Sequence, residues 1–240
     1  MSVTASPLGE LRTLDSFELF INDGPNFDVL RKDIFGQRIY HFDAARPDPR
    51  ILDGGANIGV STLYFKAIYP AARVTAFEPD PAILPLLREN LARNAMQDVE
   101  IVPAALGEQV GAAPFAADGK YGGHLAAGDD ATTHVPCVRL RDYLAQPVDF
   151  LKLNIEGAEW DVLRDAADRL PAVREMVIEY HHLPGLPRTL HHILATLDRA
   201  GFDYLLNDFD EITNPAVRPP FRLTPRTRYF LLVYAKRREL

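Results

Sequence analysis

A glycine-rich turn directly follows a short apolar run near residue 50. Residues 53–59 read DGGANIG. Glycine lets the backbone turn sharply and approach a ligand closely. Gly54 and Gly59 match the outer glycines of the dinucleotide fingerprint G-x-G-x-x-G, but Ala56 stands where the glycine that admits a pyrophosphate is required. The turn therefore predicts a close backbone approach to a ligand that carries no pyrophosphate.

Two carboxylates accompany this turn. Glu78 ends the second predicted strand, where an acid can accept hydrogen bonds from ribose hydroxyls. Asp53 places an acid beside the glycines themselves, which suits a ligand with an ammonium and a sulfonium and would repel a pyrophosphate. Either acid alone could simply cap a helix N-terminus. The combined pattern favours S-adenosylmethionine (SAM) over a nicotinamide dinucleotide as the cofactor.

A second set of reactive side chains follows two later strands. Strand alternation places Lys152, Asn154 and Glu156 on one side, and likewise Glu179 and His181. Histidine titrates near neutral pH, so we predict His181 as the general base, with Glu179 orienting it. Asn154 and Glu156 would place the acceptor. Two alternatives stay open: His181 could be a loop residue at the strand end, and Lys152 could pair with either glutamate.

Strand-like and helix-like segments alternate along the chain around these residues, which predicts a parallel sheet wrapped by helices. A final pair of segments could close the sheet in antiparallel fashion. The predicted strands are 50–53, 73–78, 99–102, 148–153, 175–180, 202–206 and 229–234, and the predicted helices are 58–68, 81–95, 158–170 and 190–200.

Two regions fall outside this alternation. Residues 1–45 are expected to form a small N-terminal cap with strand-like pieces at 17–21 and 37–42, and residues 46–240 the main domain. Residues 111–134 contain five glycines and are expected to form a flexible loop, either a lid over the substrate or a surface excursion. His124 in this loop is a weaker candidate for catalysis.

The composition is that of a soluble globular protein. The 240 residues are 47% hydrophobic and 25% charged, with a net charge of −7, which disfavours broad nucleic-acid binding. Cys137 is the single cysteine and fits a reducing compartment. With no signal-peptide pattern and no apolar run near the ~20 residues of a membrane helix, we expect a cytoplasmic protein without membrane contacts.

Four motifs carry a resemblance to a known family: 51–59 (ILDGGANIG), 76–80 (AFEPD), 104–107 (AALG) and 149–159 (DFLKLNIEGAE). Together they resemble the FkbM-type methyltransferases over about residues 37–209. The resemblance implies the class I methyltransferase fold, an α/β Rossmann-like fold with a mostly parallel sheet of about seven strands and an antiparallel last strand. It also implies methylation of a hydroxyl on a sugar or natural-product small molecule.

The resemblance assigns regions of the cofactor to residues of this chain. The glycine turn and Asp53 would hold the methionine part, Glu78 the ribose, and the alanines after the third strand the adenine edge. The cofactor-binding residues expected in this way are Asp53, Gly54, Gly55, Ala56, Asn57, Gly59, Glu78, Pro79, Ala104 and Ala105.

One residue departs from the family pattern. Asn154 stands where the family usually has aspartate, and a neutral amide neither acts as a base nor binds a hard divalent cation well. We therefore do not expect a metal, although Glu156, Glu179 and His181 could hold Mg²⁺ or Mn²⁺. Methylation of a nucleic acid or protein, and a SAM-binding module without catalysis, remain alternatives. A homodimer is compatible with the sequence.

Overall fold

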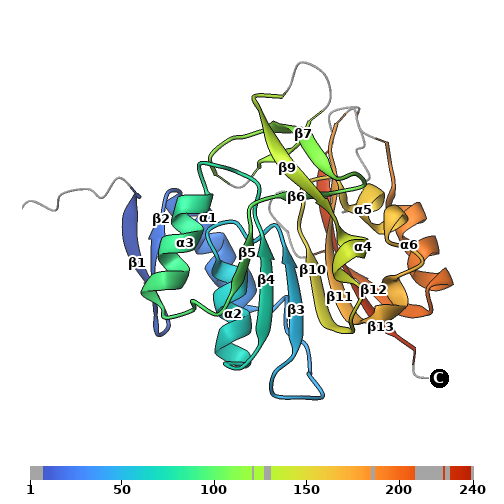
Figure 1. The fold of residues 1–240 in the computed structure, drawn as a ribbon, viewed down its shortest axis with the longest axis horizontal. Helices are drawn as coiled ribbons and strands as arrows, with labels where there is room; N and C mark the ends of the chain where they lie inside the picture. Colours follow the sequence, from blue (N-terminus) through green and yellow to red (C-terminus); the bar gives the residue numbers. More distant parts are fainter. Residues whose placement is uncertain are drawn as a thin grey trace, which may run out of the picture.

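The computed structural model describes residues 8–120, 122–126, 131–184, 187–208, 224 and 228–238. Within these ranges seven strands form one mixed sheet (Figure 1). In chain order they are β3 (Arg50–Gly54), β4 (Arg73–Phe77), β5 (Glu100–Val102), β10 (Val148–Leu153), β11 (Val173–His182), β12 (Phe202–Asn207) and β13 (Tyr229–Arg237).

The strand order confirms the predicted class I topology. It runs β12-β13-β11-β10-β3-β4-β5. The first strand of this sheet, β3, lies in its interior; β4 and β5 are added on one side of it, and β10 and the later strands on the other. Strands β3, β4, β5, β10 and β11 pair in parallel, whereas β13 is antiparallel to both of its neighbours. The carboxyl ends of β3 and β10 therefore meet at the switch point, where open α/β sheets bind ligands.

Two clusters of buried hydrophobic residues pack against the central strands. Successive residues of a strand belong to different clusters, because side chains alternate between the two faces of a sheet. Ile51 and Phe150 join one cluster, while their chain neighbours Leu52 and Leu151 join the other. Both faces of these strands are buried, which explains their nearly continuous apolar runs. The central sheet is thus a rigid platform for the loops that follow its strands.

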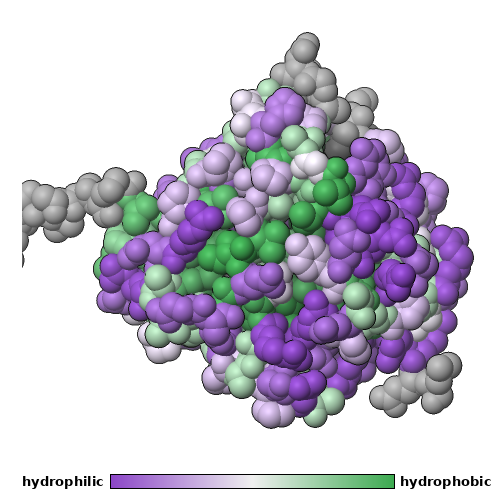
Figure 2. Space-filling view, in the orientation of Figure 1, coloured by the Kyte–Doolittle hydropathy of each residue, from purple (hydrophilic) through white to green (hydrophobic). Residues whose placement is uncertain are grey.

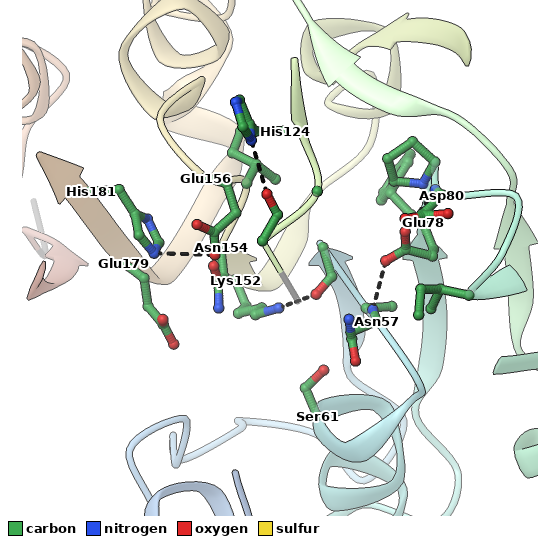
Figure 3. A pocket seen from close by; sticks show the side chains of 18 of the residues that line it. Asn57, Ser61, Glu78, Asp80, His124, Lys152, Asn154, Glu156, Glu179 and His181 are labelled. Atoms are coloured by element: carbon green, nitrogen blue, oxygen red, sulfur yellow. Dashed lines mark hydrogen bonds and ion pairs between the residues drawn. The ribbon is translucent and has the colours of Figure 1, made fainter. Parts of the chain in front are cut away.

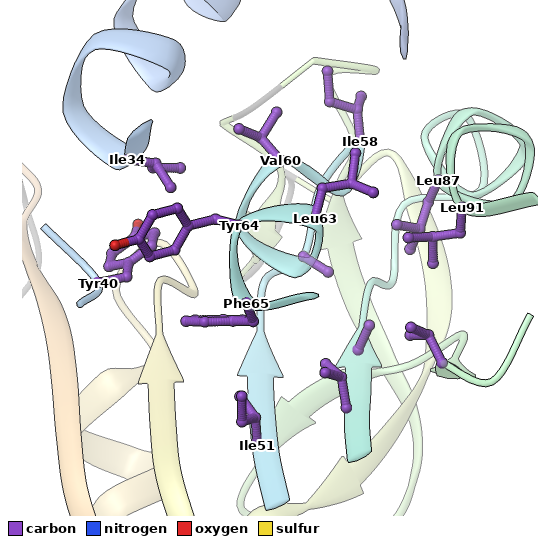
Figure 4. Packing of buried hydrophobic residues seen from close by; sticks show 14 of the residues in the cluster. Ile34, Tyr40, Ile51, Ile58, Val60, Leu63, Tyr64, Phe65, Leu87 and Leu91 are labelled. Atoms are coloured by element: carbon purple, nitrogen blue, oxygen red, sulfur yellow. The ribbon is translucent and has the colours of Figure 1, made fainter. Parts of the chain in front are cut away.

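Helices cover both faces of the sheet (Figure 1). In Figure 4, Leu63 and Phe65 of one of them lie above Ile51 of β3. The helices of the main domain are α2 (Val60–Ile68), α3 (Leu84–Arg93), α4 (Leu140–Tyr143), α5 (Glu159–Asp165) and α6 (Leu190–Arg199). None of the helices in the described ranges is both long enough and apolar enough to cross a membrane. Figure 2 shows hydrophobic residues gathered over the middle of one face of the molecule, bordered by hydrophilic ones.

The N-terminal segment shares the core of the main domain. Its elements are β1 (Glu10–Leu14), β2 (Phe17–Ile21), α1 (Gly24–Leu30) and the π-helix η1 (Arg31–Gly36). Asn90 of α3 holds β2 in place, because its Oδ1 accepts from Phe20 N at 2.7 Å and its Nδ2 donates to Phe20 O at 3.0 Å.

The strand expected at 17–21 is confirmed as β2, but the strand expected at 37–42 is wrong. That segment is irregular and pairs with no described strand. Tyr40 and Phe42 are buried, and Phe42 stacks on Phe150 with ring centroids 4.3 Å apart. Burial of the aromatic residues, rather than strand pairing, accounts for the apolar pattern.

The flexible loop expected at 111–134 is wrong in part, because strands occupy 111–116, 124–125 and 133–134. It contributes to a second sheet of order β6-β9-β7-β8, formed by β6 (Ala105–Gly107), β7 (Gly111–Ala116), β8 (His124–Leu125) and β9 (Thr133–Arg139). Phe115 and Val135 are each 2% exposed and form a small core of their own. Residue 121 and residues 127–130 of the expected loop lie outside the described residues.

Candidate active site

A cavity opens at the carboxyl ends of β3, β4, β10 and β11 (Figure 3). It collects predicted residues from both halves of the sequence. Those that line it are Gly55, Ala56, Asn57, Glu78, Pro79, Ala104, Ala105, His124, Lys152, Asn154, Glu156, Glu179 and His181. Three predicted cofactor residues, Asp53, Gly54 and Gly59, are not among the lining residues, although the structure describes all three.

The glycine turn adopts a backbone conformation that only glycine tolerates well. Gly55 has φ of +79°, and a Cβ there would lie 1.8 Å from the backbone oxygen of Asn154. The amides of Gly55 and Ala56 both donate to the Phe77 carbonyl, at 3.1 and 2.9 Å. The turn after β3 therefore packs directly against the loop after β10, and the two form adjoining walls of the cavity. Gly59, with φ of +98°, is the N-cap residue directly before α2.

Asp53 lies beneath the cavity wall. Its Oδ2 accepts from the hydroxyls of Ser61 and Thr62, at 2.7 Å each, and its Oδ1 lies 3.2 Å from Lys152 Nζ. The side chain is fully buried and does not line the cavity. Asp53 supports the turn from below.

Lys152 corrects a second expectation. The sequence suggested a pair with Glu156 or Glu179, but the register of β10 on β3 places Lys152 opposite Asp53. Its ammonium also donates to the carbonyls of Gly54 and Gly55, at 3.1 and 2.6 Å. A buried ammonium requires such partners, and here they are the acid and the carbonyls of the glycine turn.

Glu78 is held at the end of β4 by two backbone amides. Asn57 N donates to Oε2 and Asp80 N donates to Oε1, each at 2.8 Å. Burial raises the pKa of Glu78 to about 7, although these two amides act to lower it. Each oxygen retains a second lone pair for a ligand hydroxyl. Asn57 lies in the left-handed region at φ +50°, which turns its amide toward the carboxylate.

His181 has a carboxylate at each ring nitrogen. Its Nδ1 lies 3.1 Å from Glu159 Oε1 and its Nε2 lies 3.3 Å from Glu156 Oε1. Burial by itself lowers the pKa of His181, but the carboxylates of Glu156, Glu159 and Glu179 outweigh it and raise the pKa to about 9. A protonated ring has no lone pair to receive a proton, so this environment argues against His181 as the base.

Two glutamates and a tyrosine complete this end of the cavity. Burial raises the pKa of Glu156, while the His181 cation lowers it. Burial likewise raises the pKa of Glu179, whose Oε1 accepts from the Tyr40 hydroxyl. Asn154 Oδ1 is buried and has no hydrogen-bond partner among the described residues. An orphaned acceptor beside a cavity is where a ligand donor can bind.

Sequence reasoning missed Glu159 and Tyr40. Glu159 is 1% exposed and accepts from the amides of Ile155 and Gly157 as well as facing His181. Its signal was an acid two residues after Gly157 at the start of a helix, a position from which a side chain reaches back to free amides. Tyr40 carried no such signal, because it enters the site from an irregular segment 139 residues away from its partner.

The family profile of the methyltransferase FkbM domain matches residues 53–204, which include the walls of the cavity on β3, β4, β10 and β11. The chain belongs to the FkbM methyltransferase family. Methyltransferase sdnD of Sordaria araneosa is 27% identical over 85% of this chain and 92% of its own length. The 31-O-demethyl-FK506 methyltransferase FkbM of Streptomyces tacrolimicus is 28% identical over 72% of this chain and 80% of its own length.

Solved structures agree on the fold. The methyltransferase FkbM of Methylobacillus flagellatus superposes with a TM-score of 0.52 at 18% identity, covering 78% of this chain. The present chain spans only 44% of that protein. TYW2 of M. jannaschii, solved in complex with AdoMet, gives a TM-score of 0.54 at 14% identity over 98% of this chain and 88% of its own.

This FkbM family member shows no group of three or more His, Cys, Asp and Glu side chains arranged to hold a metal ion within the described ranges. The trio considered from the sequence, Glu156, Glu179 and His181, is close together, but both nitrogens of His181 face carboxylates. A histidine ligates a metal through a free nitrogen lone pair. When the ring is protonated, as the neighbouring carboxylates favour, His181 has no such lone pair.

Proposed function

We propose that this FkbM-family methyltransferase uses SAM to methylate a hydroxyl of a small molecule, either a sugar or a natural product. One observation carries the proposal. A single cavity joins the Gly55 turn and the Glu78 carboxylate, which suit SAM, to the cluster of Glu156, Glu179 and His181, which suits proton transfer. Two relatives are named for transfer to oxygen, the 31-O-demethyl-FK506 methyltransferase and the 2-O-methyltransferase NoeI of Sinorhizobium fredii.

The residues present fit the cofactor. Gly55 leaves room where a Cβ would collide with backbone, and the orphaned Oδ1 of Asn154 can accept a hydrogen bond from an ammonium. Glu78 can accept from ribose hydroxyls, and Ala104 and Ala105 leave a flat space for adenine. SAM, when bound, supplies a methyl carbon whose bond to sulfur breaks, with both electrons going to sulfur, as the acceptor oxygen bonds to that carbon.

Glu156 is the proton acceptor in this proposal, in place of His181. Its carboxylate lines the cavity, and burial raises its pKa, which strengthens it as a base. The His181 ring lies 3.3 Å from it and lowers its pKa, opposing the effect of burial. Glu156 also has φ of +52°, a left-handed conformation that is strained for a glutamate. Strain of this kind is typically kept where the placement of a side chain matters for function.

The test has two stages. Calorimetric titration with SAM and with S-adenosylhomocysteine comes first, and absence of binding at millimolar ligand would overturn the cofactor assignment. The protein is then incubated with methyl-deuterated SAM and a panel of hydroxylated sugars and natural products, followed by mass spectrometry. Labelled methyl on oxygen supports the proposal. Labelled methyl on nitrogen or carbon alone, or SAM binding without any transfer, contradicts it.

A further inference from the structure

One carboxylate oxygen at the start of α5 gathers three donors from two segments. Glu159 Oε1 accepts from Gly157 N at 3.1 Å and from Ile155 N at 3.4 Å, and it lies 3.1 Å from His181 Nδ1. The side chain is 1% exposed, so water does not compete for these contacts. Glu159 therefore joins the loop after β10 to the end of β11.

The loop held by Glu159 is the one that carries Glu156. Residues 156 and 157 both have positive φ, +52° and +101°. Such a turn is costly for glutamate and persists only when its surroundings hold it in place. The two amides that Glu159 binds, at residues 155 and 157, flank Glu156 on either side. The carboxylate thus fixes the turn from which Glu156 reaches His181 Nε2.

We propose that Glu159 is a positioning residue, which holds His181 as a fixed cation beside Glu156 and holds the turn of Glu156, so that Glu156 stays aimed at the acceptor. The part that concerns catalysis rests on the proposed function. The part that concerns His181 and the turn stands on the contacts alone. Glu159 itself does not line the cavity, so it acts through its two partners.

The charges around His181 explain why Glu159 matters. Glu156 approaches it from the loop after β10, Glu159 from α5, and Glu179 lies two residues before it on the same strand. The Phe230 ring of β13 packs against its face, with centroids 4.9 Å apart. A buried imidazolium without these anions would lose its proton, because burial disfavours the charged form. Removal of Glu159 takes away the anion that also binds Nδ1.

The test is an NMR titration of the His181 ring in wild type and in Glu159→Gln. This substitution removes the negative charge of residue 159 and retains the shape of its side chain. We expect the His181 pKa to fall by at least about one unit in the variant, the size of effect that an adjacent charge exerts. The matched control is Asp161→Asn on the same helix, whose side chain is 52% exposed and should leave the titration unchanged. Equal titration of His181 in wild type and Glu159→Gln would overturn the proposal.

Two further measurements test the same role of Glu159, one on the wild type alone and one on turnover. In the wild type, both ring nitrogens of His181 should carry protons at pH 7 by their nitrogen chemical shifts, and a neutral single tautomer would contradict the proposal even if Glu159→Gln fails to fold. Where transfer is measurable, the alkaline limb of the kcat profile should move to lower pH in Glu159→Gln. A wild type that transfers no methyl but shows the expected His181 titration would refute the proposed function and leave the positioning role intact.

Discussion

Lys152 Nζ lies 3.2 Å from Asp53 Oδ1, and both side chains are closed off from solvent. The two residues are register partners on β10 and β3. Because the same ammonium donates to the carbonyls of Gly54 and Gly55, the ion pair ties the glycine turn to the centre of the sheet. The acid at the end of β3 therefore supports the glycine turn through a lysine.

Breaking this pair should be severely destabilising. Lys152→Met leaves Asp53 buried without its cation, and removal of one partner of a buried ion pair costs about 3–5 kcal/mol. We expect urea unfolding to show a loss of this size. The double variant Asp53→Asn/Lys152→Met should recover part of it, because no uncompensated charge remains. A loss below about 1 kcal/mol for Lys152→Met would contradict the structural role.

Gly55 and Gly201 form a matched pair for testing the cofactor turn. Their φ values are +79° and +84°, but a Cβ on Gly201 meets nothing within 4 Å, whereas one on Gly55 lies 1.8 Å from Asn154 O. Gly201→Ala should cost only the left-handed backbone, about 1–2 kcal/mol. Gly55→Ala should cost at least about 1–3 kcal/mol more, through the clash, and should abolish SAM binding. Equal losses of stability for the two variants in thermal unfolding would show that the turn after β3 and the loop after β10 do not pack so closely.

Binding of SAM should depend on pH through Glu78. Its pKa of about 7 means that the carboxylate becomes protonated as pH falls from 8 to 6, which removes a hydrogen-bond acceptor for the ribose. We therefore expect the Kd for SAM to rise by up to about tenfold over this range, following the ionised fraction. Glu78→Gln should bind more weakly and without this dependence. Calorimetry at pH 6, 7 and 8 measures both, and a pH-independent Kd in wild type would rule out the assignment.

Loss of the proposed proton acceptor should affect turnover and not cofactor binding. Glu156→Gln is expected to lower kcat by roughly 10²–10⁴-fold, the usual contribution of a general base. The Kd for SAM should change by less than about threefold, because the side chain lies at the acceptor end of the cavity. Glu89→Gln on α3, whose side chain is 40% exposed, serves as the control. An unchanged kcat would exclude Glu156 as the base.

Local patterns were sufficient to predict much of the fold and to select several residues that line the cavity. Short apolar runs that alternate with helix-like segments identified the seven strands of the main sheet. The glycine turn and Glu78 were recognised because each directly follows or ends such a run. The regions predicted wrongly, at 37–42 and 111–134, are those whose structure depends on distant partners. Phe42 stacks on Phe150, and β7 pairs with β9.

The sequence by itself determined the order of the strands of the main sheet, the FkbM resemblance and the presence of carboxylates and a histidine at the strand ends. Only the tertiary structure decided what these groups do. Asp53 is covered by Lys152 because of strand register, and the pKa of His181 is raised because carboxylates from α5 and from the loop after β10 converge on it. Proton affinity depends on burial and on charges within a few ångströms, and neither quantity can be read from positions along the chain.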